Sequence, residues 1–321
     1  MNAAEWHIDS AENGLLMTES GFRFPVKVYL PCEPISHYVS HYGLRQGKSE
    51  DCVALRPIYA RTQQILEFYL LDRYQIRAPE GTWTAPRVLL AGPSTKVKGD
   101  LIYPRLVRTF TIHFHPAGLH ALFRIPIHPL ADKALPGESV LGREVSHLLN
   151  RLQNAVAVQE LAEAADEFLL RQLRGTVEIS PVEMAARWMR RRHGKVDLAL
   201  LARQCNLSLR QFERQFRECV GVAPKLFSRV ARLEFAVLRK QTNPGLSWTE
   251  VASDAGYFDQ AHLIRDTRLL AGAAPQKLLV SLPDVDFHPI EPVHRGQLER
   301  QFSEVSHFYN SPQETSNRLW R

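Results

Sequence analysis

An internal repeat within residues 183–280 constrains the fold of this chain more than any other feature of its sequence. The first unit runs from Asp197 to Pro224, and the second runs from Ser247 to Pro275. Each unit opens with a capping residue and a short amphipathic run, followed by a residue that tolerates a positive φ, Asn206 or Gly256. A second capping residue and a second amphipathic run then follow. This order predicts that each of the two units folds as a helix, a tight turn and a second helix.

The two units match at an offset of 50 before the turn, as for Ala202 and Ala252. They match at an offset of 51 after it, as for Arg214 and Arg265, so the second turn is one residue longer. A long helix around residues 227–238 is predicted to join the units. In a helix-turn-helix motif, the second helix lies in the DNA major groove with its first residues on base edges. The repeat therefore predicts two such reading helices in one chain.

The charge of the chain is concentrated in the same region. Residues 183–280 contain 17 Lys and Arg against 9 Asp and Glu, whereas residues 1–182 contain 19 of each. Residues 281–321 contain 4 Lys and Arg against 6 Asp and Glu. A basic segment of this kind favours an anionic partner such as double-stranded DNA.

The apolar residues of the second helices indicate which side chains face outward. Phe212 and Phe216 must face the core in the first unit, and Leu263 must do so in the second. The outward residues are candidate base readers: Arg210, Glu213 and Arg214 in the first unit, and Gln260, Ala261, His262 and Arg265 in the second. Glu213 could instead orient neighbouring arginines, and His262 could be a solvated surface residue.

Two further residues belong to the expected DNA-binding set. Ser208 opens the first reading helix, where a structural cap is the commoner function. Arg191 lies in the run Arg190–Arg192, which is either a solvated face or a phosphate contact.

The basic region resembles the AraC/XylS family of transcription activators. The segment LARQCNLSLRQFERQFRECVGVAP is similar to the family's first unit, and EVASDAGYFDQAHLIRDTRLLAGAAP is similar to its second. Both end in the family's G-x-x-P. The resemblance implies a one-component regulator, an activator type that works with RNA polymerase. The family usually has Phe where Thr267 stands, which predicts weaker packing there unless Leu269 or Leu270 compensates.

Residues 22–130 resemble more distantly the β-rich, cupin-like sensor domain of one AraC subgroup. LLAGPST at 89–95 and FHPAGLHALFRIP at 114–126 carry this likeness, and VSHFYN at 305–310 is similar to endings in that subgroup. The residues agree with a β-rich domain, because Thr109–Phe114 alternates apolar and polar side chains with a period of two. We expect an antiparallel barrel or sandwich, followed by paired amphipathic helices near 139–153 and 156–173 that form a homodimer contact.

The expected fold class is therefore α+β, with a β-barrel or sandwich and a helical pair followed by an all-α tandem helix-turn-helix domain. The predicted boundaries are an arm at 1–20, a sensor and dimerisation domain at 21–175, a linker at 176–182, the DNA-binding domain at 183–280 and a tail at 281–321. Five aromatic residues of the sensor domain suggest an apolar effector pocket or simply core: Tyr59, Phe68, Tyr69, Tyr74 and Trp83.

Other functions have less support in the sequence. His113 and His115, with His120 nearby, have a spacing that could place two metal ligands on one strand face, but no convincing further ligand accompanies them. No phosphate loop, nucleophile motif or paired carboxylates are present, so we expect no enzyme, metal or cofactor. An architectural DNA-binding protein without an effector, or a metal-dependent β-barrel enzyme fused to a DNA-binding domain, are the alternatives.

The location follows from what the sequence lacks. There is no signal peptide pattern and no long apolar run, and the four cysteines show no paired spacing. A cytoplasmic protein with no membrane partner is expected. The predicted function is sequence-specific, DNA-binding transcription regulation, with an N-terminal part that senses an unknown small effector, dimerises, or does both.

Overall fold

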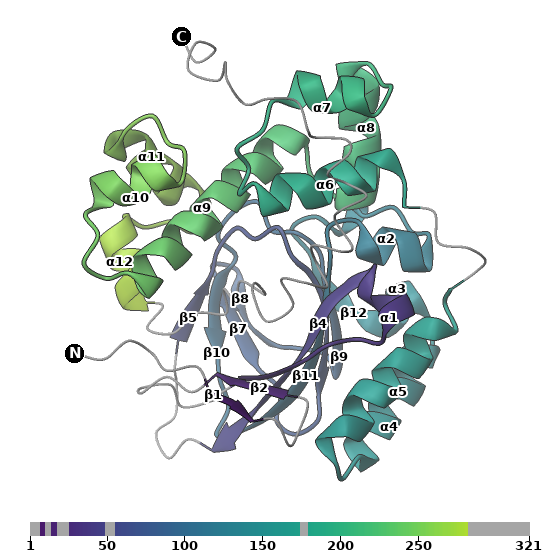
Figure 1. Cartoon of the computed structure of the whole chain (residues 1–321). Helices are drawn as coiled ribbons and strands as arrows, with labels where there is room; N and C mark the ends of the chain where they lie inside the picture. The colour runs from purple at the N-terminus through teal and green to yellow at the C-terminus, as the bar shows by residue number, and fades with distance from the viewer. Residues whose placement is uncertain (1–6, 10–13, 18–25, 49–54, 174–178, 282–321) are drawn as a thin grey trace. The chain divides into compact units, whose positions relative to one another are not determined.

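The computed structural model describes residues 7–9, 14–17, 26–48, 55–173 and 179–281 (Figure 1). In this part of the chain, the strands form two antiparallel sheets. The larger sheet has the order β1-β2-β3-β4-β11-β6-β9-β12, with β1 His7–Asp9, β2 Gly14–Met17, β3 Val26–Tyr29, β4 Val39–Lys48, β6 Gln64–Tyr69, β9 Val88–Ala91, β11 Leu106–Phe114 and β12 Ala134–Pro136. The smaller has the order β5-β10-β7-β8, with β5 Leu55–Ile58, β7 Gln75–Ala78, β8 Gly81–Thr84 and β10 Gly99–Ile102.

The helices come mainly after the strands, which confirms the α+β fold predicted from the sequence. Short helices accompany the sheets: α1 Glu33–Ser36, α2 Gly118–Phe123, a 3-10 turn at His128–Leu130, and α3 Gly137–Leu141. Two longer helices, α4 (Glu144–Asn154) and α5 (Val158–Leu170), follow. The described part of the basic region consists of helices joined by turns and short loops: α6 Pro181–Arg191, α7 Leu198–Gln204, α8 Leu209–Val220, α9 Pro224–Thr242, α10 Trp248–Asp254, α11 Gln260–Ala271 and α12 Pro275–Ser281.

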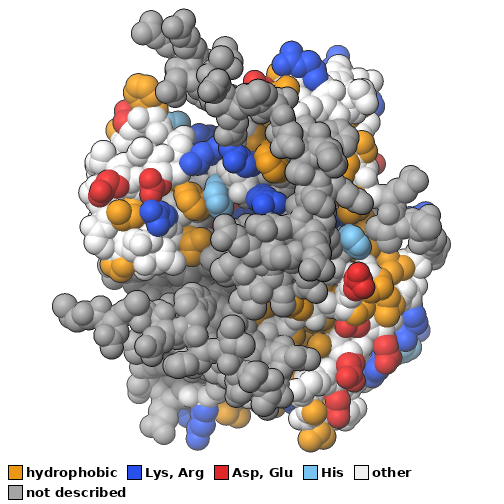
Figure 2. Space-filling model, viewed as in Figure 1, with side chains coloured by type: hydrophobic (Ala, Val, Ile, Leu, Met, Phe, Trp, Pro, Cys, Tyr) orange, Lys and Arg blue, Asp and Glu red, His pale blue; other side chains and the backbone are white. Residues whose placement is uncertain are grey.

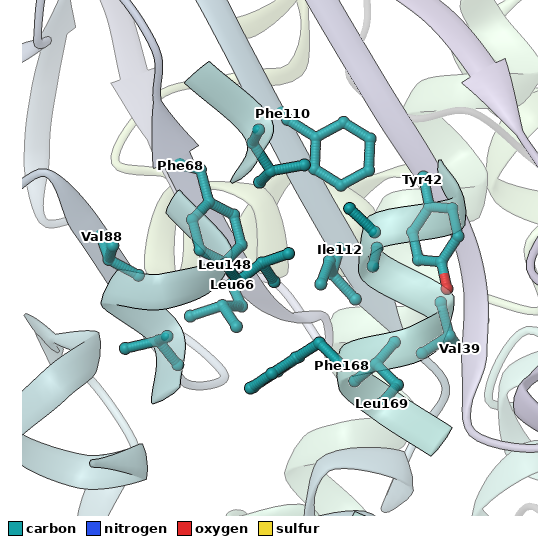
Figure 3. Close-up of a cluster of buried hydrophobic side chains, with 14 of the residues drawn as sticks. Val39, Tyr42, Leu66, Phe68, Val88, Phe110, Ile112, Leu148, Phe168 and Leu169 are labelled. Carbon is teal, nitrogen blue, oxygen red and sulfur yellow. The ribbon is translucent and has the colours of Figure 1, made fainter. Parts of the chain in front are cut away.

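Strand β11 lies at the centre of the larger sheet, where it pairs with β4 on one side and β6 on the other. Its period of two is confirmed, because Phe110, Ile112 and Phe114 are all buried in one core. Helices α4 and α5 supply the other half of this core through residues such as Leu148 and Phe168, as Figure 3 shows. Burial of these large apolar side chains is the main force that holds the helical pair on the sheet.

The helical pair matches the sequence prediction with one refinement. The first predicted helix is divided at Gly142, which adopts a positive φ of 81° and separates α3 from α4. A residue with a side chain is strained in that conformation, whereas glycine is not.

The opposite face of β11 is polar. The hydroxyl groups of Tyr74 and Thr109 are 3.2 Å apart, and Tyr69 donates a hydrogen bond of 2.7 Å to Glu67. The ring of His113 stacks on that of His41 with centroids 4.0 Å apart. Polar groups buried in this way are stable because they are hydrogen-bonded to one another.

Within the predicted arm at 1–20, His7–Asp9 and Gly14–Met17 form strands: β1 pairs with β2, and β2 pairs with β3, whose backbone edge would otherwise remain open. Of the two alternatives for the five aromatic residues, the structure favours core packing. Four are buried in three separate clusters and Trp83 is exposed on β8, since each strand sends neighbouring side chains to opposite faces.

The possible metal site also has an explanation in the fold. The ring of His113 stacks on the ring of His41. His115 lies just after the end of β11, and its backbone N–H donates a hydrogen bond to the Tyr38 carbonyl oxygen. Among the described residues, no group of three or more His, Cys, Asp or Glu side chains is arranged to hold a metal ion.

A buried carboxylate joins the β-rich half to the helical half. Glu234 of α9 accepts hydrogen bonds of 3.0 Å from both the backbone N–H and the hydroxyl of Thr62. It also forms an ion pair with Arg190 of α6, and Arg190 donates to the Thr62 hydroxyl. Tyr59 and Ala60, next to this cluster, pack on the apolar face of α9.

The first prediction concerns this cluster. Glu234→Ala leaves the Arg190 guanidinium and two Thr62 donors without their acceptor, so we expect a loss of about 3–5 kcal/mol in the free energy of unfolding. Urea titration of the full chain measures it. Glu167→Ala, which removes an exposed partner of Arg151, is the control and should change stability little. Equal effects of the two substitutions would contradict the importance of the buried cluster.

The second prediction concerns pH. Burial, with the nearby Arg187 guanidinium, lowers the pKa of His115 to about 3 from its usual 6.5. Between these values the unfolded chain binds a proton that the folded chain does not, so stability is full above pH 6.5 and falls as the pH is lowered towards 3. This one group contributes a slope of at most about 1.4 kcal/mol per pH unit. His115→Asn should flatten the dependence of stability on pH between 6.5 and 5; an unchanged slope would show that His115 is not responsible.

Candidate nucleic-acid interface

The first repeated unit folds as its sequence predicts. Asp197 caps α7, Asn206 adopts a positive φ of 55°, and Ser208 caps α8. The Ser208 hydroxyl accepts from the Gln211 backbone N–H, and the Gln211 side chain accepts from the Ser208 backbone N–H. These reciprocal bonds satisfy donors that a helix end leaves unpaired. The Ser208 side chain is thus engaged in capping the helix.

The second unit repeats this geometry. Ser247 caps α10, Gly256 adopts a positive φ of 76°, and the Asp259 carboxylate accepts a 2.7 Å hydrogen bond from the His262 backbone N–H at the start of α11. In both units the residue after the turn bonds back to the buried alanine of the first helix, Leu207 to Ala202 and Tyr257 to Ala252. The turns therefore have the same backbone design despite the extra residue.

Helix α8 is held by the two phenylalanines that the sequence assigned to the core. Phe212 and Phe216 are fully buried, and the ring of Phe216 meets that of Phe227 on α9 at 5.5 Å. The outward face of α8 consequently exposes the three predicted base readers, Arg210, Glu213 and Arg214. They lie on the first turns of the helix, where a major groove would meet it.

Helix α11 has a more varied outward face. Ala261 and Arg265 are exposed, while His262 is partly covered by an edge contact with the Tyr257 ring, with centroids 5.1 Å apart. Gln260 is also partly covered, because its side-chain oxygen accepts a 3.0 Å hydrogen bond from Thr249 of α10. The structure thus brings all four predicted residues to the start of one helix and fixes two of them.

Thr267, where the sequence departs from the AraC/XylS pattern, is fully buried. Its hydroxyl donates a 2.7 Å hydrogen bond to the Leu263 carbonyl oxygen, one turn earlier in α11. Leu270 is buried beside it, whereas Leu269 is mainly exposed. Of the two leucines proposed to compensate, Leu270 therefore occupies the core position.

The basic run at the end of α6 is divided among different environments. Arg190 is bound to Glu234 and Thr62, and the Arg192 guanidinium lies over the Trp188 ring, 5.6 Å from its centroid. Arg191 is exposed, which agrees with either prediction for the run, a solvated face or a phosphate contact.

Sequence reasoning missed two features of this region. One is the ion pair between Arg229 of α9 and the buried Asp266, at 2.8 Å, which ties α11 to the joining helix. The other is Phe258, which is 87% exposed at the start of α11. For Phe258, the one signal in the sequence was that the second turn is a residue longer than the first.

Comparison with known proteins identifies the kind of domain that the basic region forms. A helix-turn-helix domain family matches residues 201–280. No curated protein matches the chain. Among solved structures, ToxT from Vibrio cholerae O395 is similar at 10% identity and a TM-score of 0.42, covering 76% of this chain and 98% of ToxT. A second ToxT structure from Vibrio cholerae has the same identity and coverage and a TM-score of 0.44. The AraC-like transcriptional activator CuxR is similar at 10% identity and a TM-score of 0.25, covering 68% and 84%.

TM-scores below 0.5 do not establish a common fold. The identification of the basic region therefore depends only on the family that matches residues 201–280. The two capped units and their joining helix lie in the region that this family matches, so the chain carries a tandem helix-turn-helix domain, as the sequence predicted. Such a domain binds DNA. No described helix is both long enough and apolar enough to cross a bilayer.

Proposed function

We propose that the chain is a sequence-specific transcription regulator that reads DNA with α8 and α11. The observation that carries this proposal is the pair of capped helices, each fixed to α9 on one side and exposing polar and basic side chains on the other. Arg210, Glu213 and Arg214 are assigned to one half-site, with Gln260, Ala261, His262 and Arg265 on the other. Arg191 is assigned to phosphate, and RNA polymerase is the partner through which such a regulator acts.

The third prediction concerns the shape of the binding site. Two reading helices on one joining helix should enter successive major-groove segments on one face of DNA, about 34 Å apart. Because the two helices expose different side chains, one monomer should select an asymmetric sequence of about two helical turns. Selection from random DNA followed by hydroxyl-radical footprinting of the full chain tests this. Protection confined to a single groove segment would argue against reading by both helices.

The fourth prediction separates base reading from attraction to phosphate. An arginine that bonds to a guanine edge contributes about 1–3 kcal/mol at the preferred sequence and much less on random DNA. Arg214→Ala should therefore lower specific affinity more than random affinity, and Arg265→Ala should do the same. Arg191→Ala is the matched control, since a phosphate is alike at every base pair. It should weaken both affinities equally and reduce the salt dependence by about one unit of slope. Equal losses from Arg214→Ala on both DNAs would make Arg214 another phosphate contact.

We assign dimerisation to the outer faces of α4 and α5. Their inner faces are committed to the sheet, and Figure 2 shows acidic, basic and apolar side chains together over this pair. Val156, in the connection between the helices, is 91% exposed, and Leu170 near the end of α5 is 39% exposed. Sedimentation of the full chain should show a dimer that Leu170→Asp weakens. A chain that remains monomeric at high micromolar concentration would overturn this assignment.

We assign effector binding to the β-rich half. Glu67 of β6 and Thr109 of β11 share the polar side of the larger sheet with Tyr74, so the ligand we propose carries hydrogen-bonding groups that replace the bonds these side chains make within the protein. Thermal unfolding of the full chain with panels of sugars and amino acids tests this, with Glu67→Ala as the variant expected to abolish a stabilising response.

A further inference from the structure

Phe258 is the residue that makes the second turn longer than the first. It lies between Tyr257, which is buried, and Asp259, which caps α11. In the first unit the corresponding residues, Leu207 and Ser208, are adjacent. The extra residue is therefore a phenylalanine with 87% of its surface exposed, at a position where turns usually have Gly or a small polar residue.

Packing does not account for this side chain. An apolar residue just before a helix cap usually packs against the fourth residue of the helix, which here is Leu263. Tyr257 takes that place instead, because Tyr257 and Leu263 belong to the same buried cluster. Since Phe258 remains exposed, it contributes little to the stability of the turn.

The position of Phe258 relates it to the reading face of α11. Phe258 stands just before Asp259, the cap at the N-terminal end of α11. In a helix-turn-helix motif, that end of the second helix enters the major groove. The first unit has a parallel feature, because Leu209, the first residue of α8, is 44% exposed. An exposed large apolar side chain therefore lies near the start of each helix, Leu209 as the first residue of α8 and Phe258 two residues before α11.

We propose that Phe258 contacts the C5-methyl group of a thymine and makes that base part of the preferred sequence. The thymine methyl is the apolar group that the major groove offers, and side chains such as Phe contact it. The proposal rests on the function proposed above, because it requires α11 to lie in the groove. It assigns specificity to a side chain that forms no hydrogen bond with a base.

Removal of the methyl group from DNA tests this contact directly. The preferred sequence is selected with the full chain, and each thymine is then replaced in turn by deoxyuridine, which lacks only the methyl. One replacement, in the half-site protected by α11, should weaken binding of the unaltered chain about fourfold, the loss expected for one buried methyl group. Phe258→Ala should bind the selected sequence about tenfold more weakly and should be insensitive to that replacement.

Two matched variants complete the experiment. Leu71→Ala truncates an exposed apolar residue of the β-rich half that belongs to no proposed contact, and it should respond to deoxyuridine as the unaltered chain does. Phe258→Leu retains an apolar side chain and should keep part of the sensitivity. Thermal unfolding should be unchanged in Phe258→Ala, because the ring is outside the core.

The outcomes separate this inference from the proposed function. Equal sensitivity of the unaltered chain and Phe258→Ala at every thymine, with specific binding retained, would overturn the thymine contact and leave the regulator intact. Failure of the unaltered chain to select any sequence would overturn the proposed function, and the thymine contact with it.

Discussion

The rest of the structure depends on the carboxylate of Glu234. It is buried on α9, the helix that joins the two reading units, and it is satisfied by Thr62 from the β-rich half and by Arg190 from α6. A buried charge is tolerated only when its hydrogen bonds are nearly complete, so the Glu234 carboxylate is stable in this position only when these three parts come together. Because α9 carries both reading units, their position is linked to the β-rich half.

The C-terminal ends of α8 and α11 are also hydrogen-bonded to the β-rich half. The Glu218 and Val220 carbonyls near the end of α8 accept hydrogen bonds from the Ile127 backbone and the Gln64 side chain, at 2.7 and 3.1 Å. The Leu270 carbonyl near the end of α11 accepts a 3.0 Å bond from Ala60. The last carbonyls of a helix have no partner within it, so the β-rich half satisfies groups that would otherwise need water or a cap. Helices α8 and α11 are thus anchored at the ends opposite to their candidate base-reading residues, and their leading turns stay exposed.

The elements of the helical half could be predicted because their signals are local. Caps such as Ser208 and Asp259, and the turn residues Asn206 and Gly256, act on groups within a few residues of themselves, and the repeat supplied each signal twice. The position of Arg190 could not be predicted in this way. It lies in a basic run that looks solvated, and its partners are 44 and 128 residues distant in the sequence. The aromatic residues of the sheets were ambiguous for a related reason, since alternation shows that a strand has two faces but not what lies against each. Thr267 departs from the family pattern, and its buried hydroxyl is satisfied by a hydrogen bond within its own helix that the sequence alone does not reveal.

The two reading helices differ in chemistry although they share a backbone plan. Helix α8 presents three charged groups, Arg210, Glu213 and Arg214. Around the start of α11 lie Ala261, a histidine packed against Tyr257 and the exposed ring of Phe258, and Arg265 is the charged group one turn further along. Charged hydrogen-bonding groups suit the edges of G·C pairs, and apolar groups suit the methyl of an A·T pair. Under the proposed function, a monomer with these two faces would distinguish one end of its site from the other, so it would bind in a defined direction. For a regulator, that direction determines which side of the bound protein faces the neighbouring promoter.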